Sequence, residues 1–121
     1  MRYRAVNACI LFLPTLDGCQ RLAVEHRKAA DGRLHPVQQA MVDRHGSQCG
    51  FCTPGFVMSL FALYLTEQRP TRDRVNDVLS GNLCRCTGYR PIVDAAQAMY
   101  DIAWDDPVRA HAAQTAQHLL E

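Results

Sequence analysis

The hydrophobic and polar positions of this chain divide it into two parts. Residues 4–13 form a mostly apolar, partly β-prone run, and residues 22–24 form a second short apolar run after the Asp17-Gly18 turn. Both runs predict short β-strands. Two strands alone do not make a domain, so residues 1–30 are expected to be the end of a larger β structure or the edge of a sheet.

From Pro36 onward the apolar positions follow a helical period. Pro36 can begin a helix, and Gly46 can end it. A second helix is predicted from the Thr53 cap through Gln68; it is apolar nearly all round, which is typical of the buried centre of a bundle. The expected core residues are Val37, Ala40 and Met41 of the first helix and Phe56, Phe61 and Tyr64 of the second.

Three further helices are predicted in the remaining sequence. One covers residues 71–80 and ends at Gly81, and another begins at Pro91. An alanine-rich segment after Pro107 predicts a peripheral fifth helix. The inward positions are expected to be Val75, Val78 and Leu79, then Ile92, Ala95, Ala96, Met99 and Ala103.

A weak internal repeat relates these helices. The same order of features occurs twice: a helix, a glycine, a cysteine pair, a threonine and a helix that begins with proline. It occurs first around Cys49 and Cys52 and again around Cys84 and Cys86. This order predicts a four-helix bundle with pseudo-twofold symmetry and both cysteine loops at the same end. We therefore expect a helical domain over residues 31–104 and a tail or linker over 105–121.

Composition excludes several classes of protein. Thirteen Lys and Arg residues balance twelve Asp and Glu residues, so no charge excess points to nucleic acid or an anionic membrane. No apolar run approaches the roughly 20 residues of a membrane span. The apolar run of residues 8–13 is short and ends at Pro14, which disfavours a signal peptide. We expect a cytoplasmic protein.

Four of the six cysteines form two close pairs, a CxxC at Cys49 and Cys52 and a CxC at Cys84 and Cys86. A disulfide within the CxC pair would be strained, because residues i and i+2 of an extended chain point to opposite faces. Four thiolates suit either an iron-sulfur cluster or a structural zinc ion. Helix N-termini next to both pairs favour an anionic cluster, but spacing alone leaves both metals open, and also a redox dithiol or disulfide pair.

The segments "HGSQCGFCTPGFVMSLFALY" and "GNLCRCTGYRPIVDAA" resemble the helical 2Fe-2S domain of the molybdenum hydroxylases, a family that includes xanthine dehydrogenases and aldehyde oxidases. The resemblance covers roughly residues 34–100 and leans toward the small subunit of bacterial xanthine dehydrogenases. Upstream, "YRAVNACILFLPTLDG" resembles the last part of the plant-type ferredoxin domain that precedes it in that family. Residues 1–30 are accordingly expected to be a β remnant of such a domain.

The resemblance implies an electron-transfer role. Cys49, Cys52, Cys84 and Cys86 would hold one 2Fe-2S cluster, and Gln48 and Cys86 would contact the pterin of a neighbouring molybdenum cofactor. Molybdopterin and FAD would belong to a large subunit and to an FAD-binding domain or subunit. Electrons would pass from molybdopterin toward FAD and NAD during hydroxylation of purines, aldehydes or N-heterocycles, and this chain is not expected to catalyse alone.

One departure from the family pattern concerns the plant-type cluster. Cys9 stands at the position of its fourth ligand, but the CxxxxCxxC motif is missing from the sequence. We therefore expect an N-terminally truncated small subunit. Two alternatives remain open: a zinc-stapled helical binding domain, and a non-functional fragment that never binds its cluster.

Several other residues receive a plain structural interpretation. Cys9 is expected to be a buried small hydrophobe, and Cys19 to be incidental. His35 and His45 are expected to be caps or surface groups. Arg85 is expected to be a solvated or interface charge, with a raised cluster potential as the alternative hypothesis.

Overall fold

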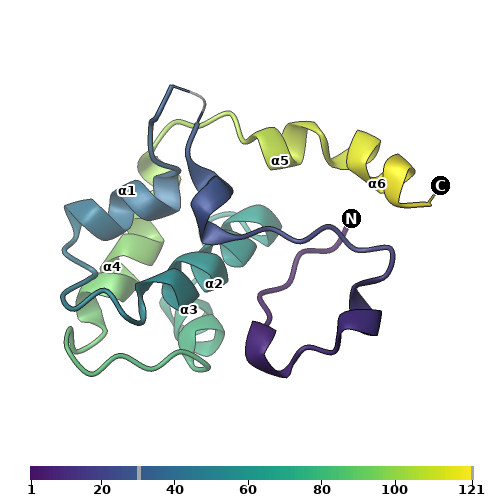
Figure 1. Cartoon of the computed structure of the whole chain (residues 1–121). Helices are drawn as coiled ribbons and strands as arrows, with labels where there is room; N and C mark the ends of the chain where they lie inside the picture. The colour runs from purple at the N-terminus through teal and green to yellow at the C-terminus, as the bar shows by residue number, and fades with distance from the viewer. Residues whose placement is uncertain (30, 121) are drawn as a thin grey trace.

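Four helices form the centre of the molecule: α1 (Pro36–Asp43), α2 (Thr53–Thr66), α3 (Arg72–Leu79) and α4 (Arg90–Ala98) (Figure 1). The computed structural model describes residues 1–29 and 31–120. Helices α1 and α3 each pack against both α2 and α4, so the order around the bundle is α1, α2, α3, α4. The predicted mainly α fold class is confirmed.

Local sequence explains where these helices begin. Proline occupies the first turn of α1, α2 and α4, where its missing N–H costs no hydrogen bond. The Thr71 side chain caps α3 by accepting from the N–H of Arg74. His35 caps α1 in a capping box, since its ring accepts from the Val37 N–H while Gln38 reaches back to the His35 N–H.

The core lies between the four helices, and α2 contributes the largest share of it. Phe56, Leu60 and Phe61 of α2 are almost completely buried, as the nearly all-apolar pattern of this helix predicts. The other helices contribute the following buried residues: Val37, Ala40, Met41, Val75, Leu79, Ile92, Val93, Ala95 and Ala96. Val78, which was also predicted to face inward, is only half-buried. The other predicted inward residues of α1 and α3 are buried, as predicted.

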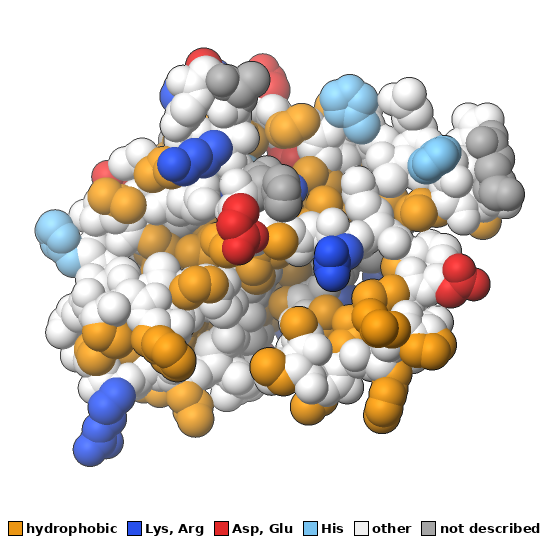
Figure 2. Space-filling model, in the orientation of Figure 1, with side chains coloured by type: hydrophobic (Ala, Val, Ile, Leu, Met, Phe, Trp, Pro, Cys, Tyr) orange, Lys and Arg blue, Asp and Glu red, His pale blue; other side chains and the backbone are white. Residues whose placement is uncertain are grey.

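The strands predicted over residues 4–13 and 22–24 are not formed in the described part of the chain, so the expected β remnant is not confirmed. Three short 3₁₀ helices stand there instead: η1 (Ala8–Ile10), η2 (Leu13–Leu16) and η3 (Val24–Arg27). A strand needs a hydrogen-bonded neighbour, and none is present in the described residues. Figure 2 shows hydrophobic side chains gathered over this N-terminal segment, where Ile10, Phe12 and Leu13 are exposed.

The C-terminal elements also differ in detail from the prediction. Helix α4 ends at Ala98 and continues as the 3₁₀ helix η4 (Met99–Asp101), so Ala103, predicted on its inward face, is exposed. The single helix predicted after Pro107 is divided into α5 (Pro107–Ala110) and α6 (Ala112–Leu120), which extend away from the bundle (Figure 1). Within the described ranges, no helix has the length and apolar composition that crossing a membrane requires.

Candidate metal centre

Two loops carry the paired cysteines, and both emerge at the same end of the bundle. Residues 44–52 connect α1 to α2, and residues 80–89 connect α3 to α4. Both loops lie at the lower left of Figure 1. The expectation that the two cysteine pairs share one end of the bundle is thus met by the structure.

The four thiols meet in pairs that cross from one loop to the other. The Cys49 thiol influences that of Cys86, and the Cys52 thiol that of Cys84, and within each pair the two pKa values shift in opposite directions. All six cysteines of the chain are free. Each contact therefore joins one cysteine of the CxxC to one cysteine of the CxC, a pairing that spacing alone did not decide.

The thiols differ in burial and in the direction of their pKa shifts. The Thr87 hydroxyl, then its N–H and that of Cys86, lower the pKa of the buried Cys84 thiol to about 7. The Phe51 N–H, followed by the Cys86 thiol, lowers the pKa of Cys49. Thiolate is the metal-binding form of cysteine, so each loop contains one cysteine whose surroundings favour that form.

The pKa values of the two remaining thiols are raised. Burial is the largest cause at Cys52, followed by donation to Cys84. At Cys86 the largest cause is its donation to Cys49. Both thiols therefore favour the protonated form in the metal-free protein, and a bound metal would displace their protons.

Polar contacts anchor both loops to α2. The hydroxyls of Ser47 and Thr53 lie 2.7 Å apart at the end of the first loop. In the second loop, the Asn82 side-chain amide donates to the Ser59 hydroxyl at 2.8 Å. A Cβ on Gly55 would stand only 3.1 Å from the Asn82 Oδ1, so the glycine permits the close approach of this loop to α2. The two loops are therefore held on one common helix.

A closed set of hydrogen bonds shapes the second loop around Cys84. The Cys84 N–H donates to the Tyr89 hydroxyl at 2.9 Å, and the Tyr89 N–H donates to Thr87 Oγ1 at 3.2 Å. Thr87 Oγ1 lies 3.1 Å from Cys84 Sγ. Tyr89 has a φ of 68°, a left-handed conformation that is uncommon for a non-glycine residue. Sequence reasoning missed Thr87 and Tyr89, although both stand in the quoted "CTGYRP".

The other residues singled out in the sequence have mixed outcomes. Gln48 is exposed beside Cys49, and its contact with a pterin stays a prediction. Cys9 was predicted to be buried, but it is exposed because its segment forms no strand against the core. Cys19 is exposed, as is Arg85 between the two cysteines of the CxC. His45 is an exposed residue, whereas His35 is a buried cap.

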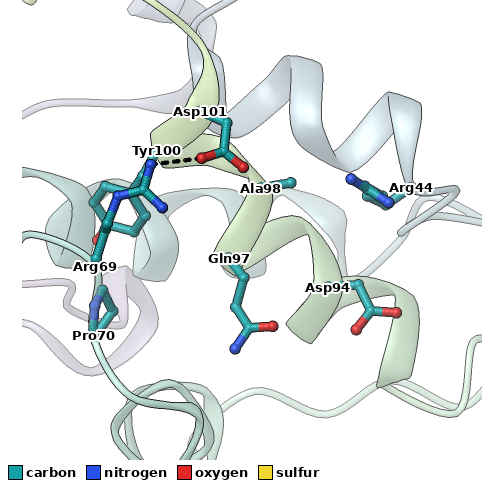
Figure 3. A pocket seen from close by; sticks show the side chains of 8 residues that line it. All are labelled: Arg44, Arg69, Pro70, Asp94, Gln97, Ala98, Tyr100 and Asp101. Carbon is teal, nitrogen blue, oxygen red and sulfur yellow. Dashed lines mark hydrogen bonds and ion pairs between the residues drawn. The ribbon is translucent and has the colours of Figure 1, made fainter.

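Two surface pockets lie away from the cysteines. One of about 430 Å³ lies beside α4, where the Arg69 guanidinium donates to Asp101 at 2.7 Å and Asp94 and Gln97 project from the helix (Figure 3). Another, of about 450 Å³, lies between α1 and the start of α2. Among the described residues, no three Cys, His, Asp or Glu side chains stand together as ligands of a single metal ion.

Comparison with known proteins assigns the paired-cysteine bundle to a family. The sequence profile of the 2Fe-2S binding domain family matches residues 23–97. This chain belongs to that family. The matched range contains both cysteine loops of this 2Fe-2S binding domain, and the resemblance drawn from its motifs is thereby confirmed.

Curated relatives of this 2Fe-2S binding domain are oxidoreductases. It is 53% identical over 92 residues to xanthine dehydrogenase of Oryza sativa subsp. japonica, with 75% of this chain and 7% of the relative covered. It is 47% identical over 97 residues to aldehyde oxidase of Homo sapiens, with 80% and 7% covered. The chain thus spans about 7% of the length of these relatives, in which such a domain is one part of the enzyme.

Solved structures agree with this assignment. Quinoline 2-oxidoreductase from Pseudomonas putida 86 superimposes with a TM-score of 0.70 at 35% identity, covering 90% of this chain and 62% of that chain. The aldehyde oxidoreductase from Desulfovibrio desulfuricans ATCC 27774 gives a TM-score of 0.60 at 36% identity, covering 80% of this chain and 10% of the other. At these identities the likeness extends beyond the fold to related sequences.

The donor set of the site suits a 2Fe-2S cluster. Such clusters are held by four thiolates, and the two loops offer Cys49, Cys52, Cys84 and Cys86 in two cross-loop pairs. The Thr87 N–H already donates to the Cys84 sulfur at 3.5 Å, as is usual around iron-sulfur centres. Cys52 is the N-cap of α2, where the helix dipole favours negative charge.

Proposed function

We propose that this domain is the electron-transfer module of a molybdenum hydroxylase of the xanthine dehydrogenase and aldehyde oxidase type. Cys49, Cys52, Cys84 and Cys86 would hold one 2Fe-2S cluster. The cross-loop pairing of their thiols in a 2Fe-2S binding domain carries this proposal. When bound, the cluster would take up and release one electron at a time.

The chain's own residues would hold and shield that cluster. The two loops supply the thiolates, and backbone N–H groups stabilise their negative charge. Helix α2 supports both loops through Thr53 and Ser59. The cross-loop contacts favour one cysteine from each loop on each iron, so that Cys49 would share an iron with Cys86 and Cys52 with Cys84.

The proposed partners follow from the relatives. Gln48 and Cys86 would face a molybdopterin-binding large subunit, and an FAD-binding domain or subunit would accept the electrons. The proposed reaction of the whole enzyme is hydroxylation of a purine, an aldehyde or an N-heterocycle, with purine catabolism as the corresponding process. Free thiols are typical of reducing compartments, which supports a cytoplasmic location.

We also propose the pseudo-twofold relation between the two halves of the bundle. Under it, α1 would correspond to α3 and α2 to α4. The helices contact one another in a cyclic order: α1 with α2, α2 with α3, α3 with α4 and α4 with α1. Exchanging α1 with α3 and α2 with α4 leaves this order unchanged, which is compatible with the proposed symmetry. The proposed domain division remains 1–30, 31–104 and 105–121, with the first part as a remnant of a plant-type ferredoxin domain.

Metal and sulfide analysis tests the proposed function directly. The full chain would be purified anaerobically and reconstituted with iron and sulfide. We expect a brown protein with about two irons and about two acid-labile sulfides per chain. Stoichiometric zinc without labile sulfide would instead support a zinc-stapled domain, and a chain that takes up neither metal would be a non-functional fragment.

A further inference from the structure

Thr87 places a hydroxyl and an N–H on the sulfur of the most buried cysteine of the site. Its Oγ1 lies 3.1 Å and its backbone nitrogen 3.5 Å from Cys84 Sγ. A metal-binding cysteine is deprotonated and has no proton to give. The Thr87 hydroxyl must therefore be the donor when Cys84 binds a metal.

Tyr89 orients that hydroxyl. The Tyr89 N–H donates to Thr87 Oγ1, which occupies one acceptor position of the oxygen and leaves its proton for the sulfur. Tyr89 is itself held at both ends of its side chain, since its hydroxyl accepts from the Cys84 N–H and its ring meets the Phe56 ring edge to face. These two side-chain contacts hold Tyr89 in its left-handed backbone conformation.

The equivalent threonine of the first loop makes a different contact. Thr53 follows Cys52 as Thr87 follows Cys86, but its hydroxyl is bonded to Ser47 at 2.7 Å. Within the described residues, no side-chain hydroxyl is bonded to the sulfur of Cys49, Cys52 or Cys86. Cys84 is therefore the one candidate ligand in these residues with a hydroxyl donor. Thr66, whose hydroxyl donates to the Ala62 carbonyl at 2.8 Å at the end of α2 far from the cysteine loops, serves as a control for Thr87.

We propose that Thr87 is a positioning residue that raises the reduction potential of the cluster through its hydrogen bond to Cys84. The inference rests on the proposed function. Reduction adds one electron, supplied by the molybdopterin-bearing partner, and breaks no bond at Cys84. The added negative charge is shared by the sulfur ligands, and a hydrogen bond to a charged acceptor is stronger than one to a less charged acceptor. Such bonds are among the factors that set the potentials of iron-sulfur clusters.

The test compares four reconstituted full-length chains: the unchanged protein, Thr87→Val, Thr87→Ser and Thr66→Val. Midpoint potentials would be measured by anaerobic titration with dithionite, followed by visible and electron paramagnetic resonance spectra. We expect Thr87→Val to have a lower potential, with an equilibrium constant for reduction about tenfold smaller, equivalent to about 59 mV for one electron. Thr87→Ser keeps the hydroxyl and should stay near the unchanged protein, as should Thr66→Val.

Each other outcome has a definite meaning. An unchanged potential in cluster-loaded Thr87→Val, or an equal shift in Thr66→Val, would overturn the role of Thr87 and leave the proposed function intact. If Thr87→Val takes up no cluster, Thr87→Ala is measured by the same criterion, and loss of the cluster in both would make Thr87 a structural residue only. Absence of a cluster from the unchanged protein would instead refute the proposed function.

Discussion

His35 and Asp106, 71 residues apart in the chain, form a buried hydrogen bond of 3.0 Å between His35 Nε2 and Asp106 Oδ2. Each residue also caps a helix. His35 Nδ1 accepts from the first turn of α1, and Asp106 Oδ1 accepts from the N–H groups of Val108 and Arg109 in α5. Because Nδ1 is an acceptor, Nε2 carries the proton and donates to Asp106. The pair joins the C-terminal segment to the bundle.

Removal of the Asp106 carboxylate should destabilise the fold. Asp106→Ala deletes the cap of α5 and leaves the buried His35 Nε2–H without a partner, so the free energy of unfolding should fall by about 2 kcal/mol. Urea unfolding followed by circular dichroism measures the change. Asp105→Ala is the matched control, since Asp105 is exposed and should change little. Equal losses in both variants would contradict the role given to the pair.

The His35–Asp106 pair should also make the free energy of unfolding depend on pH in the acid range. Burial alone raises the pKa of Asp106, but the hydrogen bonds that its carboxylate accepts from His35 and from the N–H groups of Val108 and Arg109 bring it below its ordinary value. A lowered folded pKa stabilises the folded state above the unfolded pKa of about 3.9, and this stabilisation is lost as the pH falls through the folded pKa. The other titratable groups around Asp106 are Tyr3, Arg27, Tyr64 and Arg109.

Unfolding free energies of the unchanged protein and of Asp106→Asn, measured in parallel from pH 7 to pH 2.5, test this dependence. The difference between the two proteins should be largest near neutral pH and should shrink below the unfolded pKa of about 3.9. Both proteins carry the same cysteines, so the effect of acid on a bound cluster cancels in the comparison. A difference that stays constant over the whole range would show that Asp106 does not act through its charge.

Loss of one proposed ligand should affect both the cluster and the fold. Cys84→Ser should abolish the visible spectrum and lower the melting temperature, because metal binding is coupled to folding. Cys19→Ser should change neither, since Cys19 is an exposed thiol outside the two loops. Absorption spectra and thermal unfolding of the two variants give the comparison. Similar losses in both would refute the assignment of Cys84 as a ligand.

The burial of α2 gives a prediction that does not depend on any metal. Leu60 is fully buried between the helices, whereas Leu83, next to Cys84, is 82% exposed. Leu60→Ala should lower the free energy of unfolding by about 2–5 kcal/mol through lost contacts and a cavity. Leu83→Ala should change it by less than about 0.5 kcal/mol. Chemical denaturation of the two variants decides whether α2 is the core helix described here.

Much of the helical part could be predicted from residue patterns. Proline and threonine mark the starts of α1 to α4 within a residue, and the apolar period of each helix identifies its buried face, because both signals act within a few residues. The same signals failed for Cys9, since a β-prone run forms a strand only where a neighbouring strand accepts its hydrogen bonds. The end of α4 was missed because neither a proline nor a glycine marks it.

At the cysteine site, too, some features could be predicted from the sequence and others were set by tertiary contacts. The spacing of Cys49, Cys52, Cys84 and Cys86 and the words around them predicted a four-thiolate cluster, because ligand type and spacing are local properties of the chain. Tertiary contacts decided that the thiols pair across the loops and that Thr87, not Thr53, bonds to a sulfur. They also joined His35 to Asp106. Such contacts depend on how distant segments pack together, and no local pattern of residue types encodes them.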